Sequence, residues 1–265
     1  MTFAVAGCAG RMGVALMAEV LAAEGCTLIA GSESPGHDAV GRDLGELAGV
    51  GALGVACVDV PATLFAADAV LDFTTPAATL AHARLAAAQG RVLVTGTTGI
   101  DAAQAVALEA AAASCAIVWA ANMSVGINLL LGLTEKTAAL LDESTDIEIV
   151  EMHHRHKVDA PSGTSLALGR AAAAARGVAL DDVAVRTRDG VIGPRPAGAI
   201  GFSNIRGGDV VGDHTVIFAG TGERIELTHH AADRSIYAQG ALRAARWAKD
   251  RAPGLYSMKD VLGLG

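Results

Sequence analysis

A short apolar strand, a glycine-rich turn and a helix open the chain, and this succession constrains the fold more than any other feature. Residues 3–6 are apolar, the turn Gly7-Cys8-Ala9-Gly10-Arg11-Met12-Gly13 follows, and a helical pattern covers 11–23. Such glycines permit a tight turn and let backbone N–H groups approach a pyrophosphate, which the positive end of the helix attracts. In this context the pattern favours a dinucleotide-binding domain over an ordinary tight turn.

Short apolar runs alternate with helical patterns up to about residue 122. Because strands that alternate with helices form parallel sheets covered on both faces, we expect an α/β fold with a Rossmann-type doubly wound parallel sheet. Thr75 and Pro76 suit the cap and first turn of one helix. The predicted strands span 3–6, 27–31, 55–58, 69–73, 92–95 and 117–120, the predicted helices span 11–23, 76–88 and 101–113, and 34–51 is expected to be a loop with a short helix.

The pattern changes in the second half of the chain, where strands follow one another without long helices between them. This succession predicts a second α+β domain with a mixed or antiparallel sheet. Strands are expected over 147–152, 183–188, 199–205, 210–219 and 224–230, and helices over 125–141, 164–175 and 235–249.

Composition excludes several classes of protein. The net charge of −8 and the pI near 5.4 argue against nucleic-acid or anionic-membrane partners. The apolar runs are too short to span a bilayer and no secretory signal opens the sequence, so we expect a cytoplasmic protein. Free, mostly buried thiols are expected because the four scattered cysteines form no C-x-x-C pair; they are Cys8, Cys26, Cys57 and Cys115.

The end of the second strand predicts the choice of cofactor. Glu33 lies 20 residues after Gly13, where a carboxylate accepts hydrogen bonds from the adenosine ribose hydroxyls. The next residue is Ser34 and not an arginine, and Glu33 would repel a 2′-phosphate. We therefore expect NADH to be preferred, with NADPH possible because Arg42 in the same loop could reach round to it.

Two later turns end strands at the same edge of the predicted sheet, where ligands of doubly wound sheets gather. Residues 72–76 (Asp-Phe-Thr-Thr-Pro) follow the fourth strand and 96–99 (Gly-Thr-Thr-Gly) follow the fifth. Their small residues leave room for a nicotinamide ring and their threonines offer hydrogen bonds. Either could be a plain turn, and only their placement together favours a cofactor site.

The most unusual stretch is Glu151-Met152-His153-His154-Arg155-His156-Lys157-Val158-Asp159-Ala160-Pro161-Ser162-Gly163-Thr164, with three of the eight histidines and two cations within five positions. Like charges this close repel one another unless an anion lies between them. Histidine suits general acid work at neutral pH, and lysine offers a compact charge for a carboxylate. The stretch runs into a helix start with a Ser or Thr cap, which also binds carboxylates. We therefore expect a dicarboxylate substrate.

Three other interpretations of this stretch compete with a substrate site. It could ligate a metal, but on a strand His154 and His156 share a face while His153 points away, and the ligand set is incomplete, so we expect no metal. It could also be a solvated strand end or a subunit contact.

Together these motifs resemble the 4-hydroxy-tetrahydrodipicolinate reductase family over essentially the whole chain. The family transfers hydride from NAD(P)H to a cyclic imine dicarboxylate formed from 4-hydroxy-tetrahydrodipicolinate, giving tetrahydrodipicolinate in lysine and diaminopimelate biosynthesis. The matching segments are Gly7–Gly13, 72–74, 96–99, Ala121-Asn122, 153–157, 159–164, and Gly207, Asp209, Val211, Gly212 and His214.

The resemblance implies a homotetramer whose dinucleotide-binding domain, 1–124, is completed by 234–265, with a substrate-binding and oligomerisation domain over 125–233. It implies catalytic roles for His153 and Lys157. Substrate contacts would be His154, Lys157, Ser162, Gly163 and Thr164, and cofactor contacts would be Gly7, Cys8, Ala9, Gly10, Arg11, Met12, Glu33, Phe73, Thr74, Gly96, Thr97, Thr98, Ala120, Ala121, Asn122 and Met123. Ser34 and Thr75 depart from the arginines that dual-cofactor members often carry, and Met123 replaces a frequent phenylalanine.

Two alternative functions remain beside this one. The chain could be another Rossmann dehydrogenase acting on an amino or keto acid, or a non-catalytic NAD sensor; a metal-dependent hydrolase ranks third. The pairing of His153 with Lys157 argues against a sensor, which has no need of a proton donor.

Overall fold

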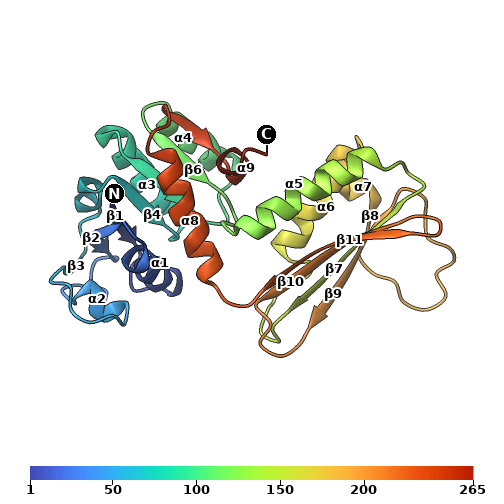
Figure 1. Ribbon diagram of the computed structural model, residues 1–265, viewed down its shortest axis with the longest axis horizontal. Helices are drawn as coiled ribbons and strands as arrows, with labels where there is room; N and C mark the ends of the chain where they lie inside the picture. Colours follow the sequence, from blue (N-terminus) through green and yellow to red (C-terminus); the bar gives the residue numbers. More distant parts are fainter. Residues whose placement is uncertain (265) are drawn as a thin grey trace. The chain divides into compact units, whose positions relative to one another are not determined.

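The computed structural model describes residues 1–264 and divides into two compact units, each with its own sheet and core (Figure 1). Unit 1 comprises Met1–Val125 together with residues 234–264, and unit 2 comprises Gly126–Asp233. Within residues 1–264, no helix is both long and apolar enough to cross a membrane.

Unit 1 is built on a seven-stranded sheet in the order β12-β6-β5-β4-β1-β2-β3, and every neighbouring pair is parallel. The predicted doubly wound parallel sheet is therefore confirmed. Its elements are β1 (Thr2–Ala6), α1 (Arg11–Ala22), β2 (Thr27–Ser32), α2 (Leu44–Leu47), β3 (Cys57–Val58), η1 (Pro61–Ala66), β4 (Ala69–Asp72), α3 (Pro76–Gln89), β5 (Val92–Thr95), α4 (Ala102–Ala112), β6 (Ala116–Trp119), α8 (Ser235–Ala248), β12 (Gly254–Tyr256) and α9 (Met258–Leu262).

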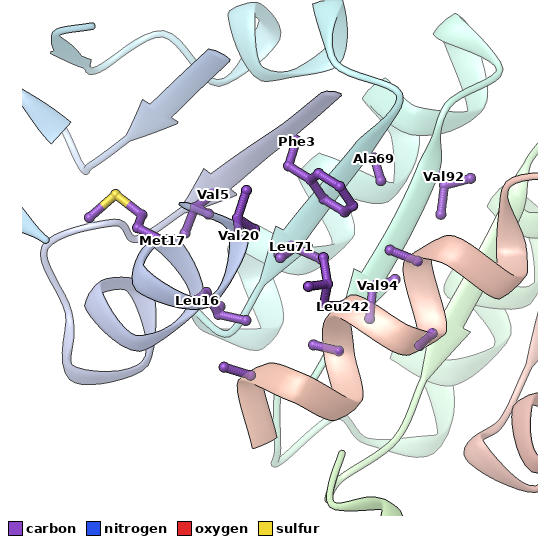
Figure 2. Packing of buried hydrophobic residues seen from close by; sticks show 14 of the residues in the cluster. Phe3, Val5, Leu16, Met17, Val20, Ala69, Leu71, Val92, Val94 and Leu242 are labelled. Carbon is purple, nitrogen blue, oxygen red and sulfur yellow. The ribbon is translucent and has the colours of Figure 1, made fainter. Parts of the chain in front are cut away.

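Alternation along the central strands divides the core of unit 1 between the two faces of the sheet. Phe3 and Val5 point to the face covered by α1 and α8, as Figure 2 shows, whereas Ala4 and Ala6 point to the face covered by α3 and α4. On the first of these faces the alanines of α8, Ala238, Ala241 and Ala245 among them, are buried against the strands. The last long helix, α8, thus completes a core that the first strand begins.

Unit 2 contains a five-stranded mixed sheet in the order β11-β10-β7-β9-β8, which confirms the predicted second α+β domain. Helices α5 and α6 cover one face, where Ile147, Ile149 and Phe218 are buried. On the opposite face Thr215 and Thr228 remain in contact with solvent. Its elements are α5 (Val125–Leu140), β7 (Asp146–His153), α6 (Gly163–Ala175), α7 (Leu180–Val183), β8 (Ala184–Val185), β9 (Ile200–Arg206), β10 (Gly212–Ala219) and β11 (Arg224–Ala231).

The strand predicted over 183–188 is only partly observed. Val183 ends the short helix α7, and strand pairing is limited to Ala184–Val185. Beyond the strand the Arg188 guanidinium contacts the Glu148 carboxylate, with two N–O distances of 2.7 Å. Four short elements, η1, α7, β12 and α9, were not predicted, because an element of so few residues shows no hydrophobic period.

Replacing Val94 by alanine tests the packing of unit 1. Val94 is fully buried between the sheet and α8, so the lost methyl groups and the remaining cavity should lower the free energy of unfolding by about 2 kcal/mol. Urea unfolding followed by tryptophan fluorescence measures the change. Val106→Ala is the matched control, because Val106 on α4 is 66% exposed. Equal stability of the two variants would contradict the assigned core.

Candidate functional site

The glycine turn of unit 1 packs too tightly to admit side chains. Gly7 has a φ of +65°, and a β-carbon on Gly13 would lie 2.1 Å from the Gly7 carbonyl oxygen. Helix α1 begins at Arg11, its N-cap Gly10 supplies no side-chain cap, and its first turn holds no acidic residue. The N–H groups of this helix end are therefore not satisfied by a cap or an acidic side chain of the turn, which is the arrangement that binds phosphate.

A hollow of about 520 Å³ lies beside this turn, at the carboxyl ends of the neighbouring strands. The Glu33 carboxylate reaches across to the turn, where its Oε1 accepts a hydrogen bond of 2.9 Å from the Ala9 N–H. Two carboxylates, Glu33 and Asp59, line the hollow, and neither lysine nor arginine does. The lining residues are Gly7, Gly10, Ser32, Glu33, Ser34, Pro35, Asp59, Pro61, Phe73, Thr74, Thr75, Ala78 and His82.

A buried carboxylate fixes the wall of this hollow. Asp72 is 0% exposed at the end of β4, and its Oδ1 accepts hydrogen bonds from the Thr74 N–H and hydroxyl at 3.0 and 2.6 Å. Its Oδ2 lies 3.0 Å from Nδ1 of His82 on α3. Thr75 then caps α3 through the N–H of Ala78, as predicted. The turn after β4 is thus fixed at its start by Asp72 and at its end by the Thr75 cap of α3.

A second hollow, of about 270 Å³, shares Phe73 with the first and extends along the ends of β5 and β6. Gly96 makes room for the Phe73 ring, because a β-carbon at Gly96 would lie 2.1 Å from that ring. The start of α8 contributes Arg234 and Tyr237. The lining residues are Arg11, Met12, Phe73, Gly96, Ala121, Asn122, Met123, Arg234 and Tyr237.

Five of the predicted cofactor residues do not line either hollow. Cys8 is buried, with its Sγ 3.3 Å from Sγ of Cys57, and Thr97 is buried against Thr79. Ala9 contributes its N–H to Glu33, Thr98 is exposed and Ala120 is half-buried. All four cysteines are free, with Cys26 half-buried and the others buried.

Asp59, His82, Arg234 and Tyr237 line the hollows but were missed by the sequence analysis. They belong to no motif and lie far along the chain from the glycine turn. Only the folded sheet brings them to it.

In unit 2, strand register gathers four polar side chains at one end of the covered sheet face. The buried residues of β7 alternate from Ile147 to Glu151 and His153. Across the sheet, Glu151 faces His214 on β10, and His153 faces Arg206 on β9. Glu151, His153 and His214 are 1%, 7% and 4% exposed. Glu151 was quoted in the sequence analysis without a role; its spacing of two from His153 is the signal that places both on one face.

The Glu151 carboxylate is the centre of this group. Its Oε1 accepts hydrogen bonds from the Ser162 N–H at 3.0 Å and from Nη2 of Arg206 at 2.9 Å, and its Oε2 lies 3.1 Å from Nδ1 of His153. Burial by itself would raise the pKa of Glu151, but the interactions with His153, Ser162 and Arg206 outweigh it and hold the pKa well below its ordinary value. Glu151 is therefore ionised at neutral pH.

His214 stands edge-on to His153, with ring centroids 5.0 Å apart and planes at 75°. Burial lowers the pKa of His214 to about 4, and the neighbouring His153 adds to this effect. The ring is therefore neutral at neutral pH, and its Nε2 lies 3.2 Å from the Ser162 hydroxyl. Potential ligand atoms of Glu151, His153 and His214 lie within 4.8 Å of one another, but Arg206 already neutralises the carboxylate, which argues against a resident metal.

The segment after His153 differs from the expected strand. Strand β7 ends at His153, and His154 and His156 lie on a turn closed by the Lys157 N–H and the His154 carbonyl. They therefore do not share a strand face, the arrangement considered for a metal site, and they lie beyond the strand predicted over 147–152. Lys157 Nζ pairs with the Asp159 carboxylate at 2.8 Å, a partly exposed pair that a substrate carboxylate could displace at small cost.

Helix α6 begins beside this turn. Ser162 caps it by accepting the Ser165 N–H, and the Ser162 N–H and hydroxyl are both engaged within the protein. Gly163 is exposed with open space around its α-carbon, and the first turn contains no acidic residue. Thr164 is half-buried beside it. At this helix start the exposed Gly163 is more accessible to an anion than Ser162, whose N–H and hydroxyl are engaged.

The parallel sheet, the uncapped glycine turn and the buried histidine–carboxylate pair define an oxidoreductase that uses a nicotinamide dinucleotide. The family described as dihydrodipicolinate reductase, N-terminus, matches residues 1–123, and dihydrodipicolinate reductase, C-terminus, matches residues 126–262. The chain belongs to the dihydrodipicolinate reductase family. The resemblance predicted from the sequence is thereby confirmed.

Similar proteins support this membership over the full length. The chain is 57% identical over 261 residues to 4-hydroxy-tetrahydrodipicolinate reductase of Dinoroseobacter shibae, covering 98% of this chain and 97% of the relative. It is 58% identical, with the same coverage, to the enzyme of that name from Ruegeria pomeroyi. The fold is similar to that of dipicolinate-bound dihydrodipicolinate reductase from Paenisporosarcina sp. TG-14, with a TM-score of 0.77, 24% identity and 97% of each chain covered.

His214 should make the stability of the protein depend on pH. The unfolded chain protonates His214 near pH 6.5 and the folded protein only near 4, so the free energy of unfolding should fall by about 3 kcal/mol as the pH drops through this window. Urea unfolding followed by circular dichroism at several pH values measures this slope. His214→Gln should reduce the slope, whereas His156→Gln, at an exposed turn position, should leave it unchanged. An unchanged slope in His214→Gln would contradict the buried neutral ring.

Proposed function

We propose that the two units of this reductase of lysine biosynthesis divide the reaction between them. The enzyme reduces the cyclic imine dicarboxylate formed from 4-hydroxy-tetrahydrodipicolinate to tetrahydrodipicolinate, the activity of its relatives. Residues 1–124 with 234–265 hold the dinucleotide, and residues 125–233 bind the substrate and move the proton. The observation that carries this division is the ionised Glu151 beside His153 next to an anion-binding helix start, in a chain whose other unit carries the dinucleotide turn.

The pyrophosphate would be held by the N–H groups of Arg11–Gly13 at the start of α1, because this helix end has no side-chain cap of its own. Glu33 would accept the ribose hydroxyls, and the hollow around Phe73 and Met123 would receive the nicotinamide, which supplies the hydride. The preference is for NADH. Glu33 and Asp59 would repel a 2′-phosphate, and no lysine or arginine lines that hollow to bind it.

On the substrate side, His153 exchanges the proton and Lys157 binds one carboxylate. Lys157 exchanges its surface pair with Asp159 for the substrate, so little free energy is lost. Gly163 and Thr164 receive the second carboxylate at the start of α6, and His154 lines the same segment. The protein thus orients the substrate, neutralises its charges and supplies the proton.

A cytoplasmic homotetramer built through unit 2 completes the proposal. The sheet face opposite α5 and α6 carries Val150, Met152 and Ile217 among polar residues, with Ile205 47% exposed. A broad sheet face of this mixed character suits packing against the same face of another copy.

Ser34→Arg tests the cofactor assignment. Ser34 is exposed beside Glu33, and an arginine there would bind a 2′-phosphate, so the ratio of kcat/KM for NADPH to that for NADH should rise about tenfold. The measurement is oxidation of each nucleotide with freshly generated substrate, followed by absorbance. Ser34→Gln is the control, since it adds length without charge. An unchanged ratio in Ser34→Arg would show that Ser34 does not face the 2′ position.

His153→Ala tests the proton-exchange role. Removal of a general acid should lower kcat about 100-fold or more, while the dissociation constant for NADH, bound by unit 1, should not change. Steady-state kinetics and NADH titration by fluorescence measure the two quantities. His156→Ala, in the exposed turn, is the control and should retain activity. Full turnover by His153→Ala would remove His153 from the mechanism.

A further inference from the structure

The two oxygens of the Glu151 carboxylate have different partners. Oε1 accepts two hydrogen bonds, from the Ser162 N–H at 3.0 Å and from Nη2 of Arg206 at 2.9 Å. Oε2 lies 3.1 Å from Nδ1 of His153, and neither atom has another hydrogen-bond partner among residues 1–264. Because both atoms are buried, each can be satisfied only by the other.

An ionised carboxylate accepts hydrogen bonds and cannot donate one. Two donors and the guanidinium charge keep Glu151 ionised despite its burial, with a pKa well below the ordinary value. In the neutral form of His153 the ring proton must then lie on Nδ1, between the ring and Glu151. Nε2 is left as the nitrogen with a free lone pair.

The surroundings of Nε2 keep this second nitrogen clear. A β-carbon at Gly212 would lie 3.0 Å from Nε2, so glycine at this position leaves space that any other residue would fill. The ring of His214 meets His153 edge-on and, being neutral, supports it without adding a charge.

We propose that Glu151 is a positioning residue: in the neutral form of His153 it keeps the ring proton on Nδ1, so that Nε2 takes up a proton from water and then donates it to the substrate. The ring is afterwards neutral again, with its proton on Nδ1 beside Glu151. This inference rests on the proposed role of His153 in the reaction. It assigns to Glu151 the part that a carboxylate takes beside the histidine of serine hydrolases, where the carboxylate fixes the tautomer and is not itself protonated.

Glu151→Gln is a sharp test because the cluster dictates how the amide must sit. Ser162 and Arg206 both donate to the Oε1 position, so the glutamine must place its carbonyl oxygen there. Its NH2 group then faces His153 and donates to Nδ1. The proton of His153 is forced onto Nε2, which is the wrong tautomer, although size and shape are nearly unchanged.

The experiment combines ¹⁵N NMR of histidine-labelled protein with kinetics. In the native enzyme the His153 signals, assigned through their loss in His153→Ala, should show a protonated Nδ1. In Glu151→Gln they should show a protonated Nε2, and kcat should fall about 100-fold or more while KM for NADH stays within about twofold. Glu223→Gln is the matched control: the same substitution in the same unit, at an exposed turn position, should change neither quantity.

The possible outcomes separate this inference from the function on which it rests. A neutral His153 ring that carries its proton on Nε2 in the native enzyme overturns the proposal without any variant, even if Glu151→Gln fails to fold. An unchanged tautomer in a folded Glu151→Gln also overturns it. A reversed tautomer with full turnover upholds the positioning by Glu151 and overturns the proton-exchange role of His153.

Discussion

The candidate substrate site depends on one buried charge, the carboxylate of Glu151. Removing an ion from water costs several kcal/mol, and the cost is repaid only if every lone pair finds a partner with good geometry. The guanidinium of Arg206, the backbone N–H of Ser162 and the ring of His153 provide these partners from one strand, one helix start and one strand end. A displacement of any of them would leave the charge uncompensated. The energetic demand of Glu151 therefore fixes the positions of His153 and of α6 together.

Unit 1 uses the same physical device at its own site. Asp72 is fully buried at the end of β4, and it holds Thr74 through the backbone and hydroxyl of that residue and His82 on α3. In both units a carboxylate at the end of a central strand, with its side chain on a buried face, orders the loop that follows. A strand end suits such a carboxylate because the hydrogen bonds of the sheet fix its backbone. The loop that follows still has backbone N–H groups that can donate to the carboxylate. The functional residues thus lie on loops, and the carboxylates on the sheet fix the positions of those loops.

Features that depend on neighbouring residues could be predicted from the sequence, whereas features that depend on contacts between distant residues could not. The glycine turn and the strand–helix alternation of unit 1 are local patterns, so their positions were predicted within a few residues. The strand predicted over 183–188 is shorter in the structure, and Arg188 beyond it pairs with Glu148, forty positions away, a contact that no local pattern shows. For the same reason Asp59, Arg234 and Tyr237 escaped prediction, since only strand order brings them to the hollows. Local patterns identify the motifs, whereas register decides their partners.

Register also explains how two adjacent histidines can differ in chemistry. His153 and His214 lie on neighbouring elements of one sheet with centroids 5.0 Å apart, and both rings are buried. His153 alone has a carboxylate oxygen within 3.1 Å of a ring nitrogen, whereas the nearest group to Nε2 of His214 is a hydroxyl, with Glu151 Oε2 at 3.8 Å. Burial lowers the pKa of His214, and no carboxylate lies close enough to offset this effect, so the ring stays neutral. His153 therefore has no positive charge beside it. Environments that separate two titratable groups in this way are what assign acid and base roles in an active site.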